Sequence, residues 1–423
     1  MNKMVGFKTV RLLVILLCFS SFIYGQNKLK GLVLEEKSKA PVSFATVYIN
    51  GTTKSAITNE NGSFTIANVS TPCLLVVSCV GYEPQMETIN KVKAEPLTLL
   101  LHAKASQLSE VVVMGKSHRD KYLTEFKNRF LGTDRWGKKA ILRNDSDLIF
   151  SQYTDTSKKD RNFLYINALG YGSIDEQYTQ WLNDNNTDGS YSVKANVPLI
   201  VDLPLLGYTV YIHLVDFTLL KTNGQEWRCL YKGYYYYKPY ETTSKHDLYK
   251  YEKNREEVYY NSSMHFLRSL YNNNLMQNGF LSVNLAFNNL TGKLEKRYND
   301  IVSFIGQKNS DLIQIEGLKN EVFTIYYFSG SDGKPLDLDK VETKNSIRNS
   351  KLKLWDRFTL HASQQEQFSV EFLDNDCAVR SNGTFPNNDI VFSGEISTSV
   401  GTRLPDDYQP KGQDEDIQPF SGI

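Results

Sequence analysis

Short runs in which apolar and polar side chains alternate recur along most of this 423-residue chain. Because a strand turns successive side chains to opposite faces, alternation at period two predicts strands with one buried face. Several such runs, separated by turn residues, fill residues 27–101, and longer ones follow at 208–215, 227–237, 281–287, 322–328, 368–372 and 390–393. The pattern predicts a mainly β protein: an amino-terminal antiparallel β-sandwich and then a larger β-rich α+β domain.

Two segments have helical spacing instead. The segment 120–131 carries aromatic residues four positions apart, namely Tyr122, Phe126 and Phe130, and Gly132 can end it. The segment 263–277 gathers its apolar residues on one face, with Ser262 able to cap its start and Gly279 its end. We therefore expect two helices against the sheets of the larger domain.

The first residues have the layout of a secretion signal. Three basic residues precede the apolar run 12–19, and Gly25 supplies a small residue at the cleavage position. The apolar run is about half of the ~20 residues that a membrane-spanning helix needs. We expect a signal peptide over 1–25, a mature chain from Gln26, and an exported protein in the periplasm or associated with the outer membrane. An uncleaved anchor is the alternative.

The balance of charges argues against a nucleic-acid partner, and the cysteine spacing argues against one disulfide. The chain has 48 basic and 47 acidic residues, so it has no bulk field that would attract nucleic acid, and we expect no nucleic-acid partner. Cys73 and Cys79 are six residues apart in a strand-like run, about 20 Å if extended, which is too far for a disulfide. Whether Cys229 and Cys377 pair stays open.

The stretch 27–101 resembles the carboxypeptidase regulatory-like domain, an Ig/transthyretin-like antiparallel β-sandwich. The resemblance rests on Gly31, Val33, Pro41, Ala45, Val47, Gly51-Thr52, Thr58-Asn59, Asn61-Gly62, Phe64, Ser78, Val80 and Gly81-Tyr82. It implies an accessory module of envelope proteins, including TonB-dependent outer-membrane receptors. The segment 108–115 also resembles the joint between that module and a receptor plug. The residues that follow are too few for a plug and a large barrel, so we do not expect a receptor.

The larger domain resembles the extracytoplasmic domain that accompanies this module in envelope proteins of unknown role. The resemblance rests on 126–132 (FKNRFLG), Pro198-Leu199-Ile200, Leu206-Gly207-Tyr208, 261–270 (NSSMHFLRSL), Ser393-Gly394-Glu395 and Leu404-Pro405. It implies an architecture and brings no activity. We divide the chain into the signal peptide 1–25, the sandwich 27–101, a linker 102–117, the domain 118–403 and a flexible tail 404–423.

Motifs for hydrolysis are missing from the sequence. A zinc carboxypeptidase needs His and Glu at ligand spacing, and none of the mature histidines has Glu three residues later. No Gly-x-Ser-x-Gly elbow occurs. The sequence therefore favours a protein without enzymatic activity. An unrecognised hydrolase with a site assembled in 118–403 is the alternative.

A polar loop is a candidate calcium site. Asp184, Asn186 and Asp188 stand at positions one, three and five of a run with Gly189 at position six, a spacing that turns alternate oxygens toward a cation. The Glu expected at position twelve is replaced by Ala195. An ordinary polar turn is the alternative, and no other cofactor is expected.

Aromatic residues of one predicted strand are candidates for stacking a sugar. Trp227, Tyr235 and Tyr237 belong to a tyrosine-rich run, and such rings combine an apolar face with a polar edge. The alternative is that they pack in a half-buried sheet. A further pattern, Gly132 to Lys138, matches the first positions of a phosphate-binding loop but follows a helix, so we interpret it as a helix-ending turn.

These observations together favour an exported cell-envelope protein with an accessory β-sandwich, a non-enzymatic binding or scaffold protein for a protein or a glycan.

Overall fold

The chain divides into two units, one formed by residues 1–50 and 54–108 and the other by residues 51–53 and 109–423. The computed structural model describes residues 28–104, 116–152, 190–222, 225–288, 293–298, 300–309, 311–319, 321–345, 364–385, 390–394 and 399–411. The predicted signal peptide, the segment 108–115 and the calcium candidates Asp184, Asn186 and Asp188 lie outside these residues.

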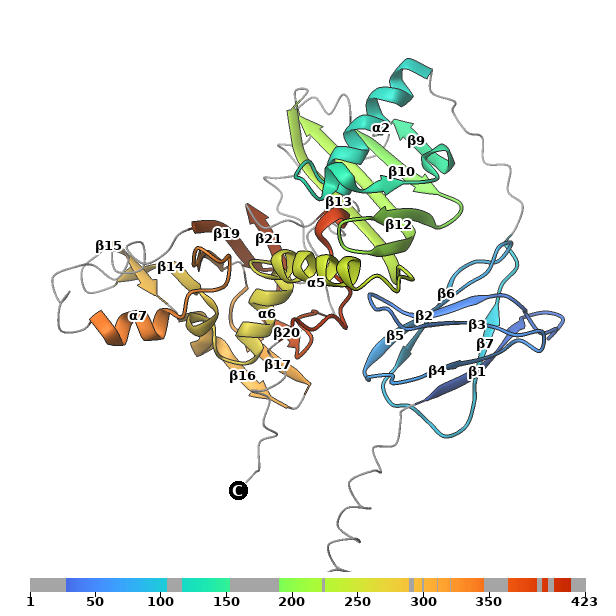
Figure 1. The fold of residues 1–423 in the computed structure, drawn as a ribbon, viewed down its shortest axis with the longest axis horizontal. Helices are drawn as coiled ribbons and strands as arrows, with labels where there is room; N and C mark the ends of the chain where they lie inside the picture. The colour runs from blue at the N-terminus through green and yellow to red at the C-terminus, as the bar shows by residue number, and fades with distance from the viewer. Residues whose placement is uncertain are drawn as a thin grey trace, which may run out of the picture. The chain divides into compact units, whose positions relative to one another are not determined.

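The amino-terminal unit is a sandwich of two sheets (Figure 1). One sheet has the strand order β4 (Ser63–Ile66), β1 (Leu29–Glu35), β7 (Leu97–Leu101). The other has the order β3 (Ser55–Ile57), β2 (Thr46–Ile49), β5 (Cys73–Ser78), β6 (Gln85–Ile89). Alternate apolar residues of both sheets fill the space between them. The predicted mainly β fold is confirmed.

One local feature of the sandwich differs from the sequence expectation. The strands β1 and β7 pair in parallel, so the sandwich is not wholly antiparallel. The Asn61-Gly62 dipeptide lies between strands of different sheets, because β3 pairs with β2 whereas β4 pairs with β1. Only Gly62 takes a positive φ there, and the Asn59 side chain accepts the backbone N–H groups of Asn61 and Ser63. The turn passes the chain from one sheet to the other.

The second unit begins with an antiparallel sheet and one helix. The sheet joins six strands: β8 (Ile141–Leu142), β11 (Leu199–Leu203), β12 (Tyr208–Thr222), β10 (Tyr191–Ala195), β9 (Leu148–Gln152) and, on β12, β13 (Gln225–Pro239). The helix α2 (Lys116–Leu131) lies along one face of this sheet (Figure 1). The predicted helix over 120–131 is confirmed, and it starts one turn earlier.

Aromatic rings fix α2 on the sheet. Phe126 lies 4.7 Å from Phe217 and Phe130 lies 5.4 Å from Tyr231, both edge-on, while Tyr122 lies 4.5 Å from Tyr191. Phe126 and Phe130 are completely buried, and full burial of such a ring stabilises the fold by roughly 1.5–3 kcal/mol. One face of the sheet is therefore the core face, and the other is covered by no part of α2.

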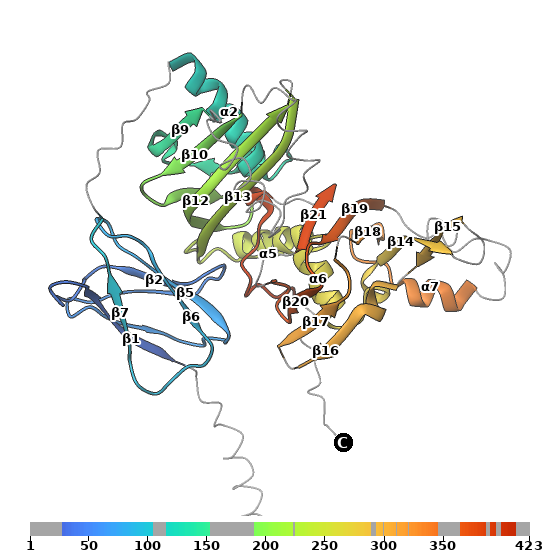
Figure 2. The ribbon, with the colours of Figure 1, turned by 180° about the vertical axis from the view of Figure 1, so that it is seen from behind.

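The rest of the second unit contains two further sheets with a helix between them (Figure 2). The larger has the order β15 (Lys293–Tyr298), β14 (Phe280–Asn288), β18 (Val322–Ser329), β19 (Gln364–Phe372), β21 (Ile390–Gly394), and the smaller β16 (Ile305–Lys308), β17 (Leu312–Glu316), β20 (Asp376–Arg380). The helix α6 (Ser263–Tyr271) fills the space between them through Phe266, Leu267 and Leu270. Ser262 caps its start as predicted, by accepting the His265 N–H.

Two helices were not expected from the sequence, and a third ends earlier than expected. The helices α5 (Lys245–Tyr259) and α7 (Leu338–Asn345) were not predicted. The predicted helix 263–277 is α6 followed by a separate 3-10 turn, 276–278, that closes at Gly279. Residues 404–411 are packed rather than loose, because Leu404 and Tyr408 are buried in the core of the six-stranded sheet.

The described helices are too short or too polar to span a membrane, and the described cysteines are free thiols. Among the described residues, no helix combines the length and the apolar character that crossing a bilayer would take. Cys229 in β13 and Cys377 in β20 carry thiols and are not joined by a disulfide.

Candidate functional site

The long ladder between β12 and β13 divides the tyrosine-rich run between two faces. Val210 pairs with Tyr237 and Ile212 with Tyr235, whereas Tyr211 pairs with Tyr236. Val210 and Ile212 belong to the buried core under α2. Because neighbours along a strand point to opposite faces, Tyr235 and Tyr237 point into the core, and Tyr234 and Tyr236 point away from it.

The two tyrosines proposed to stack a sugar are therefore interior. Tyr235 is 7% exposed and Tyr237 is 1% exposed. The Arg403 guanidinium lies 4.2 Å from the ring centroid of Tyr235 and donates to its hydroxyl over 3.1 Å. Burial raises the pKa of Tyr237 well above its ordinary value. Burial favours the packing alternative for both. Trp227 lies in β13, but its side chain is outside the described part of the structure.

The outward face of the same ladder carries a band of aromatic rings. Tyr211 and Tyr236 stack with centroids 4.7 Å apart and planes 4° from parallel. The next outward pair is His213 with Tyr234. All four side chains are half-buried, and partial burial raises the pKa of Tyr234. Tyr235 and Tyr237, named from the sequence, occupy the inward positions of the run, and the register that decides this depends on the partner strand.

A β-bulge extends this outward face beyond the rings. The pairing skips Val215 between Leu214 and Asp216, so Asp216, rather than Val215, takes the outward register and faces Lys232. Val215 is left 46% exposed. Burial raises the pKa of Asp216, and Lys194 opposes that rise. The bulge thus adds a charged rung to the aromatic band.

Lysines stand at both ends of the band. Lys238 pairs with Thr209 at one end, and Lys232 pairs with Asp216 at the other. Lys194 lies on β10, next to the second pair, and all three lysine side chains are exposed. Sequence reasoning did not single them out, although each occupies an outward position of a strand.

A charged pair borders the band on the side of β11. Arg143 donates through Nε and Nη2 to the two Asp202 carboxylate oxygens over 2.5 and 2.7 Å, and Thr209 donates to the same carboxylate over 2.8 Å. Burial and the nearby carboxylate raise the pKa of Tyr240 to about 12. Two parallel bonds fix the guanidinium in one orientation. We call the whole surface (Arg143, Lys194, Asp202, Thr209, Tyr211, His213, Asp216, Lys232, Tyr234, Tyr236 and Lys238) the outward tyrosine face.

His265 is a buried side chain without a catalytic environment. It is completely buried, and burial lowers the pKa of its imidazole to about 3. The neutral ring lies 3.3 Å by Nε2 from Asn278 Oδ1, whereas Nδ1 finds no hydrogen-bond partner among the described residues. Rings of Tyr259 and Phe280 pack at 4.9 and 4.8 Å. Such a histidine supports packing and has no access to a substrate.

Two arginines of the second unit hold backbone segments in place. Arg268 donates to the carbonyls of Asn382, Asp406 and Tyr408 over 2.9, 3.1 and 2.8 Å, so it fastens the carboxy-terminal segment to α6. Arg255 on α5 donates to the Leu206 carbonyl over 2.8 Å, with its guanidinium 4.0 Å from the Tyr208 ring. Both act as structural clamps.

The stretch that resembles a phosphate-binding loop ends a helix, as interpreted. Gly132 has a φ of +100°, and the Asp134 carboxylate accepts the N–H groups of Trp136 and Gly137 over 2.8 and 2.7 Å. These donors are therefore occupied. A Cβ on Gly401 would lie 2.3 Å from the Leu131 carbonyl oxygen and 2.7 Å from the Gly137 Cα, so glycine permits this close contact.

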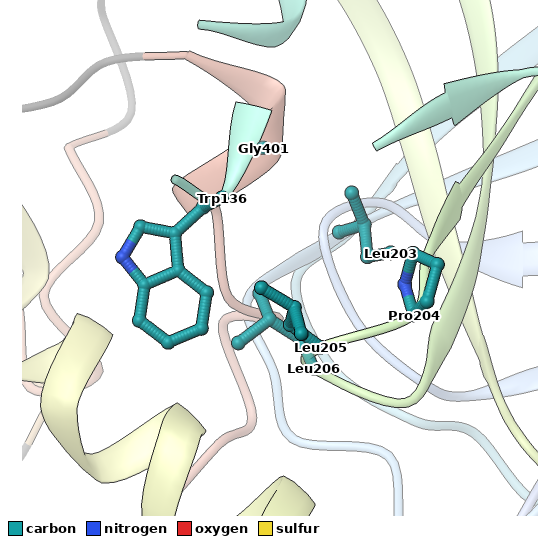
Figure 3. A pocket seen from close by; sticks show the side chains of 6 residues that line it. All are labelled: Trp136, Leu203, Pro204, Leu205, Leu206 and Gly401. Atoms are coloured by element: carbon teal, nitrogen blue, oxygen red, sulfur yellow. The ribbon is translucent and has the colours of Figure 1, made fainter. Parts of the chain in front are cut away.

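One depression lies beside that turn (Figure 3). Trp136 stands on one side and Leu205 and Leu206 on the other (Figure 3). It holds about 140 Å³, open solvent included, whereas small-molecule pockets have roughly 300–1,000 Å³. Within the described ranges, no three His, Cys, Asp or Glu side chains gather as metal ligands would. The candidate site is accordingly a surface, the outward tyrosine face.

Comparison with known families identifies the amino-terminal module. Residues 29–113 match the CarboxypepD_reg-like domain family. The chain therefore carries a carboxypeptidase regulatory-like domain, and the resemblance seen in the sequence is confirmed. The match covers the seven strands of the sandwich and the segment that follows them.

A curated relative matches part of the chain. TonB-dependent receptor P39 of Formosa agariphila is 32% identical over 106 residues, which cover 24% of this chain and 10% of the receptor. The matched segment thus spans about a tenth of the length of that relative.

Similarities to solved structures are weak. A mutant type II cohesin–X-dockerin complex from Acetivibrio cellulolyticus has 22% identity over 26% of this chain and 78% of that chain, with a TM-score of 0.17. A protein of unknown function from Bacteroides fragilis, proposed to be membrane-associated, has 12% identity over 51% of this chain and 99% of that chain, with a TM-score of 0.16. Neither carries an argument at such scores.

Proposed function

We propose that the protein is an exported component of the cell envelope, associated with the outer membrane or the periplasm, and that it binds a partner without enzymatic activity. The observation that carries this proposal is the regulatory-like domain at residues 29–113, together with the similarity of part of the chain to a TonB-dependent receptor. The leader supports it, because a basic stretch followed by a short apolar run is typical of secretion signals.

The second unit supports a binding role. Its first sheet is packed by α2 on one face and presents aromatic and charged side chains on the other. An open sheet face with ordered polar and aromatic groups suits recognition of an extended partner better than it suits chemistry, which needs an enclosed site. The partner is a protein or a glycan of the envelope.

Cell fractionation combined with amino-terminal sequencing of the native protein tests the proposal. We expect the chain in the envelope fraction, beginning near Gln26, and we expect it to retain partners when it is purified from gently crosslinked envelopes. Recovery from the cytoplasm with Met1 in place would refute export and, with it, the envelope role. A matched chain that lacks residues 1–25 serves as the control and should stay in the cytoplasm.

A further inference from the structure

We infer that the outward tyrosine face binds an acidic polysaccharide. The inference rests on the proposed function, since it names the partner class of that binding protein. Its starting point is the arrangement of side chains across β10, β11, β12 and β13, together with Arg143 after β8, which no similarity to a known protein assigns.

The aromatic part of the face suits sugar rings. A pyranose ring has an apolar face of C–H groups and an edge of hydroxyls, and tyrosine matches both with one flat ring and one hydroxyl. Tyr211 and Tyr236 restrain each other by stacking, with planes 4° apart. Rings that are already ordered lose little side-chain entropy on binding. Tyr234 extends the band by one rung along the ladder.

The charges of the outward tyrosine face favour a negatively charged ligand. Lys238 and Lys232 flank the aromatic band at its two ends, and Lys194 on β10 adds a third exposed ammonium near Asp216. The face has two carboxylates, Asp202 and Asp216, against four cations, and Arg143 binds the first of them. The chain as a whole has a net charge of only +1, so this excess of cations is local.

The layout favours a linear chain of sugars over other anions. The aromatic pairs and the flanking lysines follow one ladder in the order Lys238, Tyr236, Tyr234, Lys232, which gives an elongated strip. A protein interface of ordinary affinity would centre on a buried apolar cluster. Here the exposed apolar side chains Ile141 and Val215 stand at the margins of the strip. Uronic-acid carboxylates spaced along a polysaccharide would meet the lysines while the rings between them stack on tyrosine.

Calorimetric titration of the mature protein, residues 26–423, tests the inference with three probes: polygalacturonate, neutral dextran and single-stranded poly(dT). We expect binding of polygalacturonate that weakens with added salt, and no binding of dextran. Binding of poly(dT) as tight as that of polygalacturonate would overturn the inference in favour of a nucleic-acid surface. Absence of polygalacturonate binding would overturn it outright.

Two double variants, each with a matched control, test whether the polysaccharide binds to the outward tyrosine face. The double variant Lys232→Glu, Lys238→Glu should weaken polygalacturonate binding at least tenfold, and Tyr211→Ala with Tyr236→Ala should do the same. The matched controls lie on α5, where Lys250→Glu with Lys253→Glu reverses the same amount of exposed charge and Tyr249→Ala removes an exposed ring. An unchanged melting temperature of the lysine variants would show that their weaker binding is not caused by unfolding.

The outcome distinguishes this inference from the proposed function. Equal affinity of the face variants and the controls would overturn the polysaccharide site, and an envelope location found by fractionation would still stand. A cytoplasmic location would refute the envelope role whatever the titration gives.

Discussion

Tyr211 and Tyr236 stack across the β12–β13 ladder with ring centroids 4.7 Å apart, and the next residue along β13, Tyr237, is buried on the opposite face of the same sheet. Adjacent tyrosines in one strand thus lie in different environments, Tyr236 at the surface and Tyr237 in the core. The outward ring belongs to a polar surface with lysines at its ends. The inward ring belongs to the core under α2, where it meets Tyr208 edge-on at 5.7 Å.

This relationship predicts opposite effects for neighbouring substitutions. Tyr237→Ala should lower the free energy of unfolding by about 3 kcal/mol, because it removes a fully buried ring and leaves a cavity. Tyr236→Ala, the matched control, should lower it by less than about 1 kcal/mol, because its ring is half-exposed. Urea denaturation followed by circular dichroism gives both values. Equal losses would contradict the assigned register.

Arg268 should be needed for stability through the bonds that it donates. Arg268→Ala leaves three backbone carbonyls without their donor in a buried place, at a cost of about 2–4 kcal/mol. Arg135→Ala is the control, since Arg135 is a surface side chain over Trp136 and its loss should cost less than about 1 kcal/mol. Thermal unfolding compares them, and a similar small loss for both would show that the clamp contributes little.

His265 should make the fold sensitive to acid. Its pKa is about 3 in the folded chain and about 6.5 when unfolded, so between these values the unfolded chain binds the extra proton. The contribution of neutral His265 to the free energy of unfolding is therefore fully present above about pH 6.5, and it is lost as the pH falls toward 3. Relative to His265→Phe, the wild type should lose about 2 kcal/mol between pH 7 and pH 5. Unfolding free energies measured at several pH values provide the test, and parallel curves would speak against it.

Gly401 should tolerate no larger side chain. A Cβ there would lie 2.3 Å from the Leu131 carbonyl oxygen, so Gly401→Ala must push the 3-10 turn η5 (Val400–Thr402) away from the end of α2. Overpacking of this kind typically costs about 1–3 kcal/mol. Gly401→Ala and the exposed Val80→Ala in the other unit can be compared by differential scanning calorimetry. A melting temperature unaffected by Gly401→Ala would mean that the contact is loose.

The strands and the class of the fold could be predicted from local pattern because alternation is a property of the strand itself. The runs 208–215, 281–287 and 322–328 lie in β12, β14 and β18. The helix α5 was not predicted because it has no continuous apolar stripe. Lysine, glutamate and tyrosine make up most of its sequence. Its place depends on Asn254 and Arg255, which bond to the turn before Tyr208.

The candidate site could be predicted only in part. The tyrosine run indicated an aromatic strand, but which tyrosines face outward depends on pairing with β12 and on the bulge at Val215. Both are relations between strands that lie side by side in space, and a one-residue change of register exchanges the two faces. Arg143 and Asp202 are 59 residues apart, and Lys194 stands on a third strand, so no local pattern brings them together.

Residue-level mass spectrometry of tyrosine iodination in the mature protein, with and without polygalacturonate, tests most directly whether the outward tyrosine face is the binding surface. We predict that Tyr211, Tyr234 and Tyr236 react in the free protein and are protected by the polysaccharide, while Tyr235 and Tyr237 stay unmodified in both. Rapid iodination of Tyr235 and Tyr237, or equal labelling of Tyr236 with and without the polysaccharide, would contradict the account.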